Sequence, residues 1–153
     1  MISRKTKYAL QALGRLADNP VGEPMLIADL AERDRIPRKF LEAILVTLRK
    51  GGVLHSRAGR GGGYQLALPA AEITLARIVR LLDGDFAPLP CLDAVHPARC
   101  DECDDLDTCG TRLVMADVRQ AVTTTLEGIT LADMVERSRA AAASRRGRVD
   151  FSI

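Results

Sequence analysis

The stretch LAERDRIPRKFLEAILVTLRKGGVLHSRAGRGGGYQLAL, residues 30–68, decides the fold. Pro37 suits the first position of a helix, because its missing N–H would have no partner there, and Gly51-Gly52 ends that helix. Its apolar residues recur at helical spacing and leave a basic face outward; they are Phe40, Leu41, Ile44, Leu45 and Leu48. A short helix over 26–33 precedes it, so the pair predicts a helix-turn-helix.

The residues that follow predict a β-hairpin. Residues 53–56 and 64–68 read as strands, and the intervening RAGRGGG at 57–63 is rich in glycine, which permits positive φ at a hairpin tip. A hairpin directly after a recognition helix is a wing. With further amphipathic helices over 3–18 and 73–82, residues 1–84 are expected to form a winged helix-turn-helix domain.

Such a domain binds double-stranded DNA by placing its second helix in the major groove. Arg38 and Lys39 suit guanine edges, and the carboxylate of Glu42 accepts from cytosine N4. Arg57 and Arg60 on the wing suit phosphates or the minor groove, since neighbouring glycines let the backbone lie close to DNA. These five side chains are the predicted DNA-binding residues.

Charge is segregated along the chain. Residues 1–70 carry 12 Lys and Arg against 6 Asp and Glu, whereas residues 71–137 carry 6 against 13. A basic front half indicates a polyanionic partner, and an acidic middle makes contact over the whole surface unfavourable. The opposite interpretation, ordinary solvated faces, is equally open from charge alone.

Composition narrows the class of protein. With 153 residues, 3% aromatic residues and no Trp, the core must be aliphatic, which favours a mainly α fold with one small β-hairpin. No stretch approaches the about 20 apolar residues of a membrane span, so a cytoplasmic protein without membrane contact is expected. No catalytic constellation or phosphate-binding motif is present, so we expect no enzyme.

The second half divides into a loop, two helices and a tail. Residues 85–109 contain three prolines and seven acids, and they predict a loop of a length that is uncommon unless something orders it. A long helix over 110–126 follows, and then a short helix over 131–138. The Ala- and Arg-rich residues 138–153 are expected to form a flexible tail.

All four cysteines lie in that loop or at its end, as C-x8-C-x2-C-x5-C: Cys91, Cys100, Cys103 and Cys109. Clustered cysteines in a reducing compartment indicate metal binding or redox activity rather than structural disulfides. Four thiolates complete either an iron-sulfur site or a zinc site. The spacing lacks the paired CxxC of most zinc ribbons, which favours iron-sulfur, with zinc as the alternative.

The chain resembles the bacterial winged-helix regulators that include the iron-sulfur cluster regulator IscR and the nitric-oxide sensor NsrR. The resemblance rests on KYALQALGRLA, on LAERDRIPRKFLEAILVTLRKGGVLHS, on GRGGGYQLA, on EITLARIVRLLDG and on TLADMVE. It implies a homodimer joined by the long helix over 110–126. It also implies a cluster, [2Fe-2S] or [4Fe-4S], whose state changes DNA affinity.

The cysteine pattern departs from that of the family, which has C-x5-C-x5-C and a fourth ligand of another type. Cys103 and Cys109 fit the second spacing, but Pro97 stands at the first cysteine. Lys7 and Arg112 replace the acidic residue and the histidine that serve as the fourth ligand. An all-cysteine site agrees with both replacements.

The sequence therefore predicts a dimeric repressor or dual regulator that binds a palindromic operator, because two protomers contact two half-sites. Its cluster is expected to sense iron, nitric oxide or redox state. Two alternatives stay open: a regulator with structural zinc that senses nothing, and a small iron-sulfur electron carrier that binds no DNA.

Overall fold

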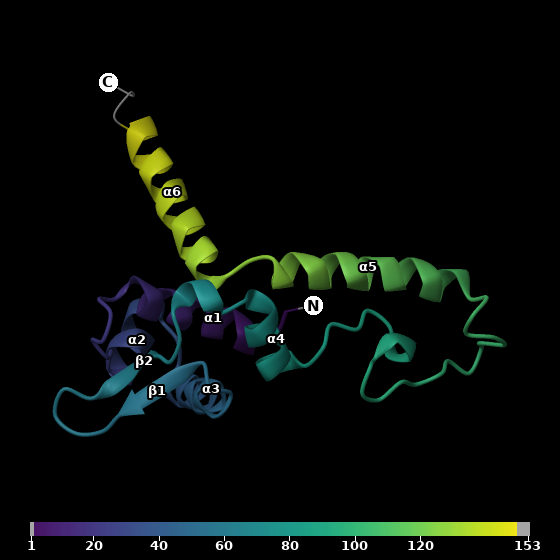
Figure 1. Cartoon of the computed structure of the whole chain (residues 1–153), viewed down its shortest axis with the longest axis horizontal. Coiled ribbons are helices and arrows are strands. Elements are labelled where there is room, and N and C mark those ends of the chain that lie inside the picture. The colour runs from purple at the N-terminus through teal and green to yellow at the C-terminus, as the bar shows by residue number, and fades with distance from the viewer. Residues whose placement is uncertain (1, 150–153) are drawn as a thin grey trace.

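The computed structural model describes residues 2–149 (Figure 1). Its elements, in chain order, are α1 (Arg4–Asp18), α2 (Ile27–Asp34), α3 (Arg38–Lys50), β1 (Leu54–Arg57), β2 (Gly63–Leu66), η1 (Ala70–Glu72), α4 (Leu75–Asp83), η2 (Pro90–Leu92), α5 (Gly110–Glu127) and α6 (Leu131–Val149). The two strands form one antiparallel sheet. The fold is mainly α with a small β-hairpin, which confirms the predicted class.

One aliphatic core lies inside residues 2–84 and the start of α6. Its fully buried large hydrophobic side chains come from α1, α2, α3, β1, α4, α6 and the residues just before β1 and α4: Leu13, Leu30, Leu41, Ile44, Leu45, Leu48, Val53, Leu54, Ile73, Ile78 and Leu131. Burying each contributes about 1.5–3 kcal/mol to folding. Leu131 also donates its N–H to the Ile73 carbonyl at 2.8 Å, so α6 begins on this body.

Polar caps define where the helices begin. Ser3 Oγ accepts from the Thr6 N–H at 3.2 Å at the start of α1, and Thr74 Oγ1 accepts from the Arg77 N–H at 3.3 Å at α4. Thr130 and Asp133 exchange backbone-to-side-chain bonds of 2.8 and 3.1 Å at the start of α6. Such caps satisfy helix N–H groups that have no partner within the helix.

Residues 85–127 leave this body as an arm. The chain runs outward through η2, turns back at the cysteine-bearing loop and returns along α5 (Figure 1). Helix α5 packs on α4 and on η2, yet none of its 18 residues is buried. Leu113, Val114 and Val118 are 50%, 59% and 40% exposed, so α5 presents aliphatic side chains to solvent.

Two predictions about single segments are wrong. The helix expected over 131–138 continues to Val149, because Ala and Arg are strong helix formers; the expected flexible tail is therefore helical up to that residue, and 150–153 lie outside the described residues. Phe40, expected in the apolar stripe, is 40% exposed. Its ring meets Tyr8 edge to face, with centroids 5.8 Å apart, at the margin of the core.

Among the described residues, none of the helices has the length and apolarity that crossing a membrane requires.

Candidate DNA-binding surface and cysteine loop

Helix α3 holds its outer face in place by burying the opposite one. Leu41, Leu45 and Leu48 are fully buried, which orients Arg38 and Lys39 to solvent at the start of the helix. Arg38 Nε lies 3.3 Å from Glu42 Oε1, one turn along. Two of the three predicted base-reading side chains are therefore paired with each other on the surface of α3.

The wing depends on two close backbone approaches. Strands β1 and β2 pair from Leu54 with Leu66 to Arg57 with Gly63. A Cβ on Gly62 would lie 2.2 Å from the Arg57 carbonyl oxygen, and one on Gly63 would lie 2.3 Å from that of Met25. Only glycine fits at these positions, because any side chain would overlap backbone atoms.

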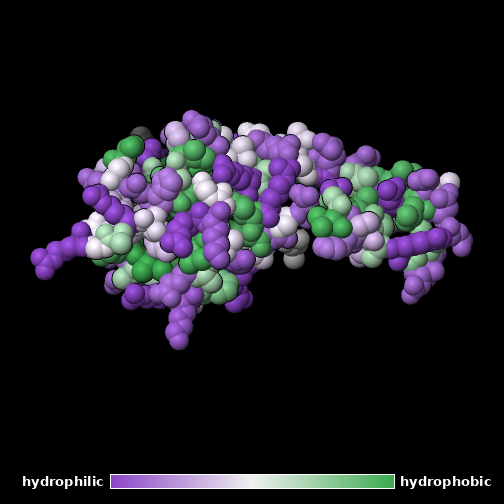
Figure 2. Space-filling view, turned by 60° about the horizontal axis from the view of Figure 1, so that its bottom comes forward, coloured by the Kyte–Doolittle hydropathy of each residue, from purple (hydrophilic) through white to green (hydrophobic). Residues whose placement is uncertain are grey.

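Met25 anchors the wing to the body. It exchanges backbone hydrogen bonds with Tyr64, of 2.9 and 2.8 Å, beside the β1–β2 pair. The tip beyond this anchor carries Arg57 and Arg60, both exposed. The wing projects from the body at the lower left of Figure 1, and hydrophilic side chains project from the same end in Figure 2.

Two arginines fix the recognition helix relative to the wing. Arg49 at the end of α3 donates to Ser56 Oγ on β1 at 3.1 Å. Arg77 of α4 donates to the carbonyl oxygens of Gly51 and Gly52, at 3.0 and 3.4 Å. The sequence alone does not predict this role of Arg77, because nothing in the spacing of residues 51 and 77 indicates that the two segments meet.

The cysteine loop carries four free thiols, with no disulfide among them. Cys91 lies half-buried in η2, next to the buried Leu92. Cys100 is exposed, Cys103 is half-buried, and Cys109 immediately precedes α5. The Cys103 N–H donates to the Cys100 carbonyl at 3.2 Å, so these two cysteines share one tight turn.

Charged side chains shape that turn. The Arg99 guanidinium donates from Nε to the Cys103 carbonyl at 2.8 Å and from Nη2 to the Asp104 carbonyl at 2.5 Å. Asp105 accepts from the Asp107 N–H and from the Thr108 hydroxyl, both at 3.0 Å. The Asp107 N–H, followed by the hydroxyl, holds the pKa of Asp105 below its usual value. These contacts bend the chain just before Cys109.

Two neighbouring thiols act on that of Cys103. Partial burial raises the pKa of the Cys103 thiol, and the neighbouring Cys109 and Cys100 raise it further. Four free thiols on one loop are suitable donors for a soft metal centre. Within residues 2–149, however, no three Cys, His, Asp or Glu side chains stand close enough together to hold a metal ion. A metal centre held by all four thiols would therefore require the loop to close.

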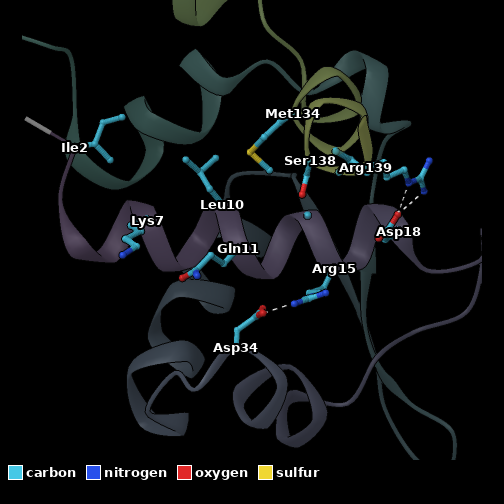
Figure 3. A pocket seen from close by; sticks show the side chains of 12 residues that line it. Ile2, Lys7, Leu10, Gln11, Arg15, Asp18, Asp34, Met134, Ser138 and Arg139 are labelled. Carbon is cyan, nitrogen blue, oxygen red and sulfur yellow. Dashed lines mark hydrogen bonds and ion pairs between the residues drawn. The ribbon is translucent and has the colours of Figure 1, made fainter. Parts of the chain in front are cut away.

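A groove with a cavity volume of 640 Å³ runs along α1 between α2 and α6 (Figure 3). Leu10 and Met134 supply apolar lining, and Arg15 Nε lies 3.0 Å from Asp34 Oδ1 at its edge. The Asp34 side chain is only 6% exposed, yet its Oδ2 has no hydrogen-bond partner in the described structure. A buried carboxylate oxygen without a donor is unfavourable.

A helix-turn-helix followed by a glycine-built wing, with basic side chains on both, defines a winged-helix DNA-binding protein. The chain belongs to the Rrf2 family, whose model is described as an iron-dependent transcriptional regulator and matches residues 2–137. Members of this family are transcription regulators and not enzymes. Membership of this family thus confirms the predicted resemblance, the DNA-binding helix-turn-helix and the expectation that the chain is not an enzyme.

Relatives and solved structures agree with this assignment. An Rrf2-like helix-turn-helix transcriptional regulator of Rhodobacter capsulatus is 40% identical over 145 residues, covering 93% of this chain and 97% of that protein. The structure of IscR from T. potens matches with a TM-score of 0.72 at 29% identity, covering 92% and 90%. CymR, the global cysteine regulator of B. subtilis, also gives 0.72, at 27% identity over 90% and 97%.

Proposed function

We propose that this Rrf2-family regulator is a homodimeric repressor whose affinity for a palindromic operator is controlled by an iron-sulfur cluster. The observation that carries the proposal is the set of four free cysteines on one loop of an arm that packs on the winged-helix body. The cluster, [2Fe-2S] or [4Fe-4S], is held by Cys91, Cys100, Cys103 and Cys109. Its signal is iron, nitric oxide or redox state.

The donor set supports an iron-sulfur cluster over a disulfide framework. None of the four thiols is in a disulfide and three of them lie in or next to one turn, which lets a metal complete the folding of the loop. When bound, the cluster supplies thiolate-ligated iron that reacts with oxidants and nitric oxide. The chain supplies the thiolates, and the tight turn at Arg99 sets the spacing between Cys100 and Cys103.

The exposed arm supports a dimer. Helix α5 has no buried residue, and its aliphatic side chains form hydrophobic surface on the protruding arm (Figure 2). The groove beside α1, with its apolar lining by Leu10 and Met134, is a second surface that suits a protein partner. Burial of both against a second copy removes apolar area from water, which is the main driving force of association. A dimer with two-fold symmetry reads a palindrome.

On DNA, Arg38, Lys39 and Glu42 are proposed to meet base edges, and Arg57 and Arg60 to meet phosphates or the minor groove. Arg38 and Glu42 form an ion pair with each other in the free protein. We therefore expect them to contact neighbouring bases, with Arg38 at a guanine and Glu42 at a cytosine. The positive charge on both elements makes binding steeply dependent on salt.

The test is anaerobic purification followed by an absorption spectrum and by iron and sulfide analysis. We expect a brown protein, with visible absorption that Cys103→Ser and Cys109→Ser each remove. A colourless protein containing zinc would instead favour the structural-zinc regulator.

DNA binding is then measured on the same sample, with and without the metal. The probe is a duplex selected by the wild-type protein from a random library. We expect the two forms to differ in affinity for it. A brown protein that retards no DNA would favour the electron carrier and would overturn the proposal.

A further inference from the structure

Helix α4 touches the joint between the recognition helix and the wing. That joint is Gly51-Gly52, and the Arg77 guanidinium donates to both of its carbonyl oxygens. Leu81, one turn further along α4, covers the same joint: a Cβ on Gly51 would lie only 2.6 Å from both Leu81 methyl carbons. A shift or rotation of α4 therefore changes the position of the joint.

The next arginine of α4 holds the arm. Arg80 Nε lies 3.1 Å from Asp85 Oδ1, and its Nη2 lies 2.5 Å from Glu127 Oε1. Asp85 is where the arm leaves the body and Glu127 is the last residue of α5. One guanidinium thus binds both ends of the arm. Arg77 and Arg80, three residues apart on one rigid helix, contact the two functional parts of the molecule.

We propose that Arg80 is a positioning residue for DNA binding, which couples the cysteine arm to the α3–wing joint through α4. When the cysteine loop closes around its metal or opens, the ends of the arm move relative to α4. Arg80 transfers that movement to α4, and Arg77 with Leu81 transfers it to Gly51-Gly52. This inference rests on the proposed function, because it concerns how the state of the cysteine loop reaches DNA.

A purely structural role makes a different prediction. Isolated, partly exposed ion pairs contribute about 0–1 kcal/mol to stability, so Arg80→Gln is expected to leave the fold intact. If the pair only stabilised the arm, its loss would leave the α3–wing joint unchanged. If Arg80 couples the two parts, its loss alters the joint more than 20 residues away in the chain. A demonstrated effect at a distance is what distinguishes coupling from proximity.

The first readout needs no metal. Hydrogen exchange is measured on cluster-free wild type, on Arg80→Gln and on Arg139→Gln, whose arginine forms a comparable exposed ion pair with Asp18 on α1. We expect Arg80→Gln to speed exchange at the Gly52 and Val53 amides, which bond Arg49 and Leu48 at 3.0 and 2.9 Å. Arg139→Gln is expected to leave these amides at the wild-type rate.

The second readout is the ratio of DNA dissociation constants with and without the metal, on the same selected duplex. Allosteric ratios are typically about 5–150-fold, and we expect Arg80→Gln to move the wild-type ratio towards one while Arg139→Gln retains it. Arg80→Glu combined with Glu127→Arg restores one of the two ion pairs and is expected to recover part of the ratio.

The outcomes separate the two claims. A wild-type ratio of one overturns the proposed function, and the inference is then judged on exchange alone. Unchanged exchange at Gly52 and Val53 in Arg80→Gln overturns the inference, as does a full wild-type ratio in that variant. Faster exchange at the joint with a reduced ratio supports it.

Discussion

Gly63 sits where the wing passes closest to the body, with a φ of +142°. Its missing Cβ leaves room for the Met25 carbonyl, which receives the Tyr64 N–H at 2.8 Å. We predict that Gly63→Ala destabilises the fold by about 1–3 kcal/mol through backbone strain, and more if the Met25–Tyr64 bonds break. Urea unfolding followed by circular dichroism measures the loss.

Gly59 is the matched control for that substitution. It also has a positive φ, of +89°, but a Cβ there would meet no atom within 4 Å. Gly59→Ala is expected to cost about 1 kcal/mol, the penalty of the left-handed conformation alone. Equal losses in the two variants would mean that the contact with Met25 contributes nothing.

A second prediction at this scale concerns acid. Burial opposes ionisation of Asp83, but hydrogen bonds from the Ser3 hydroxyl and N–H, at 2.5 and 2.9 Å, hold its pKa below the ordinary 3.8. A lowered folded-state pKa contributes stability above the unfolded-state pKa and loses it as pH falls through the folded value. Asp83→Asn should therefore destabilise the protein by about 1 kcal/mol at pH 7.

The difference between wild type and Asp83→Asn should shrink below pH 3.8. Denaturant midpoints at pH 7 and in that acid range measure it. Asp117→Asn on the exposed side of α5 removes the same charge and serves as control. A difference that stays constant with pH would show that the carboxylate charge of Asp83 is irrelevant.

The positions of some single side chains could be predicted from the sequence, and those of others could not. Helical spacing correctly oriented Leu41 and Leu48 inward, because burial of a continuous stripe is what fixes a helix on its core. The Arg38–Glu42 ion pair is a local contact, because residues four apart are neighbours on a helix surface. Arg77 could not be found in this way, since its partners lie 25 and 26 residues away and depend on how α4 packs.

At the scale of elements, the predicted DNA contacts of the wing can be removed without disturbing the fold. Arg57 and Arg60 are exposed at its tip, so replacing them leaves the core unchanged. Each phosphate contact adds about 0.9 to the slope of log binding constant against log salt. We predict that Arg57→Ala with Arg60→Ala weakens DNA binding and reduces that slope by about 2. Fluorescence anisotropy over a salt series measures both.

Arg139→Ala on α6 removes a positive charge that pairs with Asp18 instead. It is expected to leave the slope at the wild-type value. A double wing variant whose slope is also unchanged would place the wing away from the phosphates.

Helices and strands could be predicted where they depend on a local pattern in the sequence. The glycine-rich tip located the hairpin, and Pro37 located the start of α3 within one residue. The end of α6 was misjudged because a run of Ala and Arg has high helix propensity but no apolar stripe, so burial gave no signal there. The turns of the cysteine loop depend on Arg99 and Asp105, whose bonds are local but have no periodic signature.

For the whole molecule, the position of the arm follows from contacts between distant segments. Arg80 meets Glu127 across 47 residues, and Leu75 donates to the Ile129 carbonyl at 2.9 Å. Neither contact is encoded in local spacing. As a result, α5 lies beside the body with its aliphatic side chains exposed to solvent. In a single copy of the chain this apolar surface faces water, so we expect a second copy to cover it.

That expectation is tested by adding charge to the exposed aliphatic side chains. Val114 and Val118 are 59% and 40% exposed, so Val114→Asp with Val118→Asp should cost the isolated protomer little stability. In a dimer the same carboxylates would be buried without partners, which is strongly unfavourable. We predict that sedimentation equilibrium finds a dimer for wild type and a monomer for the double variant, with DNA affinity lower by about 10²–10⁴-fold because the half-sites are no longer linked. Val95→Asp adds charge at a valine that is 69% exposed in the cysteine loop, outside α5, and should stay dimeric. A double variant that stays dimeric too would move the interface away from α5 and leave the groove at Asp34 as the surface to examine.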